Sequence, residues 1–172
     1  MVTWGRAGFG GDSRGVAEQL STGVQIVVGN ANAFAAVKVD GSVVTWGFVT
    51  DGGDSRGVAE QLSSGVQTVV GNGWAFAAVK VDGSVVTWGL AGAGGDSRGV
   101  AEQLSSGVQT VVGNEHAFAA LKVDRSVVTW GRADWGGESR GVAEQLSSGG
   151  QTVVGNYSDC KAGTSADMIW QI

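Results

Sequence analysis

The chain has 172 residues, a formal net charge of −5 and an apolar fraction of 42%, which is typical of a globular protein rather than a disordered one. Because no basic tract is present, nucleic-acid binding through phosphate contacts is disfavoured. Because no apolar run approaches the roughly 20 residues of a membrane helix, membrane insertion is not expected. The 31 glycines and the absence of proline indicate short elements joined by sharp turns.

The single cysteine and the N-terminal sequence bear on the compartment. Cys160 has no second cysteine with which to form an internal disulfide, which favours a reducing, intracellular environment. The first residues lack the charged region and apolar run of a signal peptide. Neither feature identifies a particular compartment.

A 42-residue internal repeat organises the chain. Trp4, Trp46, Trp88 and Trp130 follow one another at this interval, each within the motif V-T-W-G. Periods of about 20–50 residues are typical of solenoids, propellers and arrays. We therefore expect a single repeat domain over residues 1–172, with units at about 1–42, 43–84, 85–126 and 127–172, the last of them degenerate.

The elements of the first copy can be predicted in chain order. Residues 12–20 predict a short capped helical turn or an irregular strand, in which Val16 and Leu20 can pack on one face. Residues 24–28 are rich in β-branched side chains and predict a strand that ends at a G-N pair. Side chains of residues 33–39 alternate between two faces, which predicts a second strand.

A tight turn and a third strand complete the unit. Asp40-Gly41 is a hairpin signal, and residues 43–46 predict the strand that follows it. The unit therefore contains a three-stranded antiparallel meander.

A meander of this size cannot bury both of its faces alone, so neighbouring units must cover it. The small side chains of Ala33, Ala35 and Ala36 would let adjacent sheets approach closely, and the repeated tryptophans are expected to be core anchors. The predicted fold class is all-β: a β-propeller-like array of about four 42-residue antiparallel blades, in a closed ring or an open arc. The N-terminal V-T-W-G is expected to pair with, or cap, the terminal blade.

Residues 30–47 resemble the repeat of the regulator of chromosome condensation family. That repeat carries A-L-x-x-D-G-x-V-x-x-W-G and, after four further residues, a glycine; Asp40-Gly41, Trp46-Gly47 and Gly52 keep these offsets. The resemblance covers almost the whole chain and implies a β-propeller with four-stranded blades. The best-known member of that family exchanges nucleotide on a small GTPase and docks on nucleosomes, whereas other members inhibit enzymes or act as scaffolds.

The chain also departs from that family. Alanine stands at Ala33, Ala75 and Ala117, where the family usually has histidine, and G-G-D-S replaces G-Q-L-G. The family's units are often nearer to about fifty residues, and about seven usually close the ring. Nothing here matches an exchange-factor site, so the resemblance does not imply that activity. Similar G-G-D-S and A-F-A-A sequences occur in long arrays of marine microbes, whose roles are mostly unassigned.

Four copies of G-[DE]-S-R-G raise the possibility of a serine hydrolase. A serine nucleophile needs a neighbouring base, and the chain has one histidine, His116, for four such serines. The motif also lacks the strand–turn–helix context of a nucleophile elbow. We expect instead that Asp12 or Ser13 caps the next turn by accepting backbone N–H bonds, and that the protein is not an enzyme.

Metal and cofactor binding are not expected either. The recurring acidic residues do not follow the spacing of a calcium loop, and His116 with Cys160 is a weak pair of ligands. No phosphate-binding G-x-x-x-x-G-K-[ST] occurs.

The copies differ mainly in two windows, the four residues after W-G and the two residues after G-N. In an antiparallel meander both windows lie at the same end, so they are expected to form one variable rim, with the D-G-S turns at the opposite end. Aromatic residues are enriched in interface hot spots, and the mixed charges of the rim suit a protein partner. The partner-binding candidates are Phe9, Phe48, Asp51, Trp74, Glu115, His116, Arg132, Trp135 and Tyr157.

The sequence thus favours a non-catalytic protein-interaction module that binds an unidentified protein through this rim. Two alternatives stay open: a structural subunit of a larger assembly, such as a photosynthetic one, and a consensus-type repeat scaffold without a natural partner. Self-association that completes the propeller is a further option.

Overall fold

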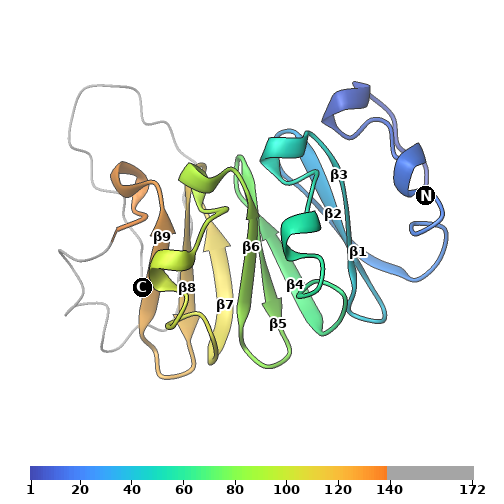
Figure 1. Cartoon of the computed structure of the whole chain (residues 1–172). Coiled ribbons are helices and arrows are strands. Elements are labelled where there is room, and N and C mark those ends of the chain that lie inside the picture. Colours follow the sequence, from blue (N-terminus) through green and yellow to red (C-terminus); the bar gives the residue numbers. More distant parts are fainter. Residues whose placement is uncertain (139–172) are drawn as a thin grey trace.

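A computed structural model of the chain describes residues 1–138, and it contains three three-stranded antiparallel sheets within that range (Figure 1). The strands are β1 (Val24–Gly29), β2 (Ala33–Lys38), β3 (Val43–Gly47), β4 (Val66–Gly71), β5 (Ala75–Lys80), β6 (Val85–Gly89), β7 (Val108–Gly113), β8 (Ala117–Lys122) and β9 (Val127–Gly131). The short 3-10 turns are η1 (Ala7–Phe9), η2 (Arg14–Val16), η3 (Val49–Asp51), η4 (Arg56–Val58), η5 (Ala91–Ala93), η6 (Arg98–Val100) and η7 (Ala133–Trp135).

Each sheet is the meander that the sequence predicts. In the first sheet Phe34 is paired with Gly29 on β1 and with Trp46 on β3, and the other two sheets repeat this register. The D-G turn closes through a hydrogen bond from the Gly41 N–H to the Lys38 carbonyl, 2.9 Å long. The predicted strands and turn are confirmed.

The family resemblance implies a fourth strand in each blade, and this expectation is wrong for the described sheets. The residues between W-G and the next β1-type strand form two 3-10 turns, η3 and η4 in the second unit, rather than a strand. Gly52 ends η3 in a left-handed conformation with φ of 102°.

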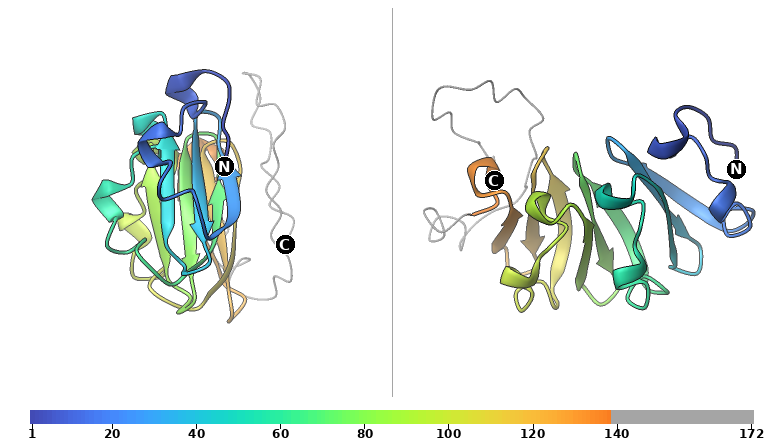
Figure 2. Two further views of the ribbon diagram at one scale, coloured as in Figure 1. Left: turned by 90° about the vertical axis from the view of Figure 1, so that its right-hand side faces the viewer. Right: turned by 45° about the horizontal axis from the view of Figure 1, so that its top comes forward.

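The sheets pack face to face in an open row (Figures 1 and 2). One face of β2, formed by Ala33, Ala35 and Val37, joins a buried cluster with Val69 and Phe76 of the second sheet. The same contact recurs between the second and third sheets. The prediction that neighbouring units cover each other is therefore confirmed, and the alanines, all 0% exposed, permit the close approach.

The tryptophan of V-T-W-G anchors each sheet. Trp46, Trp88 and Trp130 are 5%, 4% and 3% exposed, and each stacks on the phenylalanine that faces it on the neighbouring strand. The Trp88 Nε1–H donates to the Gly52 carbonyl at 3.1 Å, and the other two indoles make the equivalent bond. The predicted role as core anchor is confirmed for these three copies.

Trp4 is the exception, because it is 85% exposed and the prediction of a core anchor is wrong for it. Among the described residues no β2-type strand faces it, so it lacks the phenylalanine on which the other tryptophans stack. Residues 1–5 belong to none of the three sheets.

The predicted pairing of the N-terminal strand with the terminal blade involves residues outside the described range. Within that range, the N-terminus and β9 lie at opposite ends of the row, and the sheets do not close into a ring (Figure 1). No helix among residues 1–138 has the length and apolarity needed to cross a membrane.

Candidate binding rim

The two variable windows are hydrogen-bonded to each other at one end of the sheets. We call them the G-N loops (residues 31–32, 73–74 and 115–116) and the W-G loops (48–51, 90–93 and 132–135). The N–H of Phe48 donates to the Asn32 carbonyl at 2.8 Å, and the second and third units repeat this bond at 3.0 Å. The D-G turns lie at the opposite end, at the bottom of Figure 1. The loops together form the loop rim.

An asparagine that is present in every copy holds the two loops together. The Asn72 Nδ2 donates to the carbonyl of Ala93, the last residue of the W-G loop, at 2.6 Å. Its Oδ1 accepts the backbone N–H groups of Trp74 and Ala75. Asn30 and Asn114 make the same contacts in their own units. The loop backbones are thereby fixed independently of the variable side chains.

The sequence did not predict that this asparagine joins the two loops of the rim. Its signal is present in the sequence, because G-N recurs at the same position in each unit. In the structure, Asn72 is 1% exposed. A buried side-chain amide needs partners for both of its ends, and the two loops supply them.

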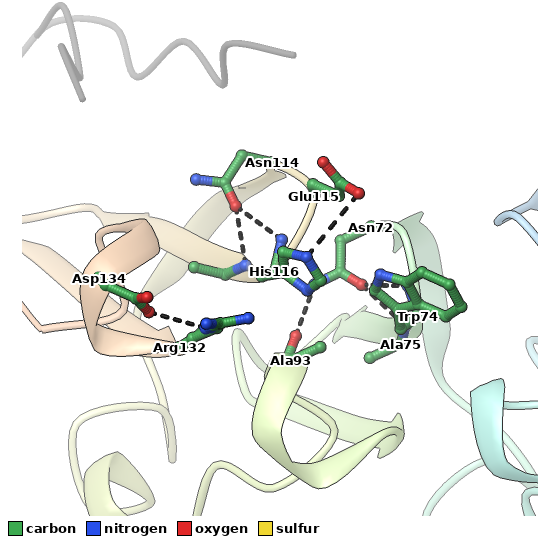
Figure 3. A network of polar contacts seen from close by, with 10 residues as sticks. Asn72, Trp74, Ala75, Ala93, Asn114, Glu115, His116, Arg132 and Asp134 are labelled. Carbon is green, nitrogen blue, oxygen red and sulfur yellow. Dashed lines mark hydrogen bonds and ion pairs between the residues drawn. The ribbon is translucent and has the colours of Figure 1, made fainter. Parts of the chain in front are cut away.

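Three aromatic candidates, Trp74, His116 and Trp135, form one cluster, and Figure 3 shows Trp74 and His116 in it. Trp74 and His116 are stacked with ring centroids 6.2 Å apart, and His116 and Trp135 form a T-shaped pair with centroids 4.5 Å apart. His116 Nε2 lies 3.8 Å from a carboxylate oxygen of Glu115. The loop rim is therefore continuous across the second and third units.

A second aromatic pair lies nearer to the N-terminus. Phe9 and Phe48 stack with centroids 5.6 Å apart, and the guanidinium of Arg6 lies over the Phe9 ring at 4.6 Å. Farther along the rim, Arg132 and Asp134 form an exposed ion pair at 2.8 Å.

Asp51 differs from the other candidates because its carboxylate faces inward. The residue is 4% exposed and accepts hydrogen bonds from Asn32 Nδ2 at 2.7 Å and from the Thr50 hydroxyl at 2.9 Å. This carboxylate joins the G-N loop of residues 31–32 to the W-G loop of residues 48–51 and is not presented to a partner. Tyr157, the last candidate, lies outside the described residues.

The G-[DE]-S-R-G segments make structural contacts. The carboxylate of Asp54 accepts the Arg56 backbone N–H at 3.0 Å, so the aspartate is the cap of η4. Ser55 makes no side-chain cap bond, so of the two predicted caps, the aspartate and the serine, the serine is wrong. The Ser55 hydroxyl lies 3.0 Å from the Thr45 hydroxyl instead. The other described copies repeat both contacts.

The one histidine, His116, makes its contacts on the loop rim, with Trp74, Trp135 and Glu115. Within residues 1–138, no three side chains of His, Cys, Asp or Glu gather into a metal site.

The repeated aspartate–arginine pairs give a testable dependence on pH. Hydrogen bonds from the Arg56 side chain and then its backbone N–H lower the pKa of Asp54 to about 2, from an ordinary 3.8. A carboxyl group with a lowered folded-state pKa stabilises the fold above its unfolded pKa, and that contribution is lost as pH falls from about 4 to about 2. Because the arginines are exposed, salt should weaken the effect.

We therefore expect the Asp54, Asp96 and Asp12 carboxyl groups to titrate near pH 2 in an NMR experiment on the folded protein. The variant R56A should move the Asp54 titration toward 3.8 and leave Asp96 unchanged. Titration of Asp54 near 3.8 in the unaltered chain would contradict this geometry.

Comparison with known proteins gives matches of fold only. No family model matches the chain, and no curated protein sequence matches it. Solved structures do match. One is the complex of Kap60 with yeast RCC1 (Prp20), at 17% identity and a TM-score of 0.47, covering 69% of this chain and 32% of the matched one.

Two other matched structures are human WBSCR16 and the CRINKLY WD40 ectodomain of the Arabidopsis thaliana receptor kinase ACR4. Each is 18% identical and covers 63% of this chain; the TM-scores are 0.46 and 0.43, and 33% and 38% of the matched chains are covered. The chain thus spans about a third of the length of these structures. Within residues 1–138 the fold is all-β, an open row of three antiparallel three-stranded sheets.

Proposed function

We propose that the protein is a non-catalytic interaction module that binds a protein partner through the loop rim. The observation that carries this proposal is that, within each unit, variable side chains stand on loops that an unvarying asparagine holds in place. The residues that differ between copies lie mainly in two loops, and the unvarying Asn72 and its equivalents hold those loops together. A fixed backbone with variable side chains is suited to recognition, because the side chains can change without loss of the fold.

The exposed chemistry of the rim favours a protein as the partner. Phe48, Val49 and Leu90 are 43%, 63% and 41% exposed, so the chain leaves apolar side chains uncovered there. Arg132 and Glu115 place both signs of charge on the same rim. Apolar and aromatic side chains with mixed charges are typical of protein–protein contacts, in which a few aromatic residues supply most of the binding energy.

We expect W74A and W135A each to weaken partner binding by about 2 kcal/mol or more, which is roughly a 30-fold loss of affinity. Both side chains are only partly buried, and the aromatic contact with His116 that each of them loses is worth about 0.5–1.5 kcal/mol. The fold should therefore persist. The measurement is binding of each variant to the partner captured from the source cells, with thermal unfolding recorded in parallel.

Val81 supplies a matched control at the opposite end of the sheets. It is 75% exposed and precedes a D-G turn, so V81A removes an accessible apolar side chain away from the rim. Unchanged binding by V81A together with the loss in W74A would support the proposal. Equal losses in both variants, or a loss confined to V81A, would refute it.

A further inference from the structure

The outer edge of β3 carries main-chain groups that point away from its sheet. β3 pairs with β2 on one side, and no strand of the described residues pairs with its other side. The Val43 N–H donates to the Leu62 carbonyl, outside the sheet, at 2.9 Å, so the main-chain groups of Val43 face this outer edge. Because bonding directions alternate along an antiparallel strand, those of Thr45, two residues later, face it as well.

The main chain of Thr45 has no partner at this edge. Among residues 1–138, neither its N–H nor its carbonyl bonds to another main-chain group there. Its hydroxyl, by contrast, is held by the Gly53 carbonyl at 3.3 Å and by the Ser55 hydroxyl at 3.0 Å. A donor and an acceptor that project together from a strand edge form a template for a further extended chain.

A cleft of about 450 Å³ lies at this edge. Val43 packs on the core between the first and second sheets, whereas Val44 packs on the cluster of the first unit, and both line the cleft. The cleft therefore spans both faces of β3. Its other lining residues are Gln19, Thr45, Val49, Gly53, Asp54, Ser55 and Arg56. The equivalent positions one unit earlier, Thr3, Gly11, Asp12, Ser13 and Arg14 among them, line a second cleft of about 450 Å³.

The walls of the cleft define the chemistry of an occupant. Arg56 is paired with Asp54, and the hydroxyls of Thr45 and Ser55 are bonded to each other. What remains is the main-chain donor and acceptor of Thr45, beside three valine side chains. An extended peptide offers the matching acceptor and donor on a single residue and directs its neighbouring side chains to the two faces of the strand. A charged side chain would find no free partner in the cleft, so uncharged side chains fit it best.

We propose that this β3-edge cleft binds a short, extended and uncharged segment of a partner protein, which pairs with Thr45 through two main-chain hydrogen bonds. The chain closes the edge at both ends, because the Leu62 carbonyl takes the N–H of Val43 and Gly53 lies against the carbonyl group of Gly47. The space between these ends suits about three extended residues, roughly 10 Å of chain. The cleft shares only Val49 with the loop rim, and the proposal does not depend on binding at that rim.

The test is an NMR titration of the full isotope-labelled chain with a capped peptide of five alternating valine and threonine residues. We expect a saturable shift of the Thr45 amide signal and, at saturation, hydrogen exchange of that amide slowed about tenfold. The same peptide N-methylated at its central residue lacks the N–H that the Thr45 carbonyl accepts. It should therefore bind about tenfold more weakly.

Filling the cleft tests the site from the side of the protein. Gln19 is exposed and lines the cleft, so Q19W should abolish the response of the Thr45 amide. Q103W makes the same change at the equivalent exposed position two units later and should keep the response, as should the rim variant W74A. Circular dichroism shows whether each variant is folded, and the N-methylated peptide decides the test if Q19W is not.

An unresponsive Thr45 amide at millimolar peptide would overturn the proposal. So would equal binding of the N-methylated peptide, an undiminished response in folded Q19W, or shifts confined to the loop rim. Protection of the Thr45 amide that rises with protein concentration in the absence of peptide would assign the edge to a second copy of the chain and would also contradict the proposal. Because W74A leaves the cleft intact, the cleft and the partner-binding rim can fail independently.

Discussion

Replacing Trp88 with alanine is expected to lower the free energy of unfolding by about 3–5 kcal/mol, the usual cost of removing a buried aromatic side chain. The side chain is 4% exposed, it stacks on Phe76 with centroids 5.3 Å apart, and its indole N–H bonds to the Gly52 carbonyl. The variant loses the packing between two units and also leaves the Gly52 carbonyl without this donor. Chemical denaturation followed by circular dichroism gives the change.

The same substitution at Trp4 is the matched control. Trp4 occupies the same position of V-T-W-G but is 85% exposed, so W4A should change stability by less than about 0.5 kcal/mol. Equal effects of W88A and W4A would mean that the packing between units does not depend on the buried tryptophans, and the description of the core would be wrong.

The second large effect is expected for Gly53→Ala. A Cβ at this position would overlap the carbonyl group of Gly47, which is main chain and cannot rotate away. Overpacking typically costs about 1–3 kcal/mol, and a clash between two backbone segments belongs at the upper end, about 3 kcal/mol. Thermal unfolding measures the loss.

Gly57 tests whether the effect belongs to the site or to glycine replacement in general. A Cβ there would meet nothing within 4 Å, and its φ does not lie in the left-handed region. Gly57→Ala should therefore be neutral or stabilise the protein by about 0.4–1 kcal/mol, because alanine restricts the unfolded chain. A loss at Gly57 as large as that at Gly53 would contradict the close approach of residues 47 and 53.

Much of the fold could be predicted because the repeat shows each signal several times. Alternation in residues 33–39, the D-G pair and the β-branched run before G-N each specify a local conformation, and the strands occur where these signals place them. Face-to-face packing follows from the alanines, since a strand with Ala33 and Ala35 on one face has too little side chain to form a core without a close neighbour.

What could not be predicted depends on which elements are present around a residue. Trp4 and Trp88 have the same local sequence, and only the presence or absence of a facing strand separates a side chain that is 85% exposed from one that is 4% exposed. The four-stranded blade implied by the family resemblance also failed, because η3 and η4 occupy the residues that a fourth strand would need.

The sequence predicted which end of the sheets carries the candidate site, but not how every side chain there is oriented. The topology of a meander places the G-N and W-G loops at the same end, and the hydrogen bond between Phe48 and Asn32 joins them there. The inward orientation of Asp51 depends on an amide 19 residues earlier in the chain, which no local pattern reveals. Whether the rim binds a partner stays a prediction.

Site-specific photocrosslinking tests the central claim, recognition through the loop rim, most directly. A photoreactive phenylalanine analogue is placed at Phe48, which is 43% exposed on the rim, or at Val81, which is 75% exposed at the opposite end, and each folded protein is irradiated in a lysate of the source cells. We predict one discrete covalent adduct with another protein from position 48 and none from position 81. An adduct formed from position 81, with position 48 unreactive, would contradict the assignment of the binding surface.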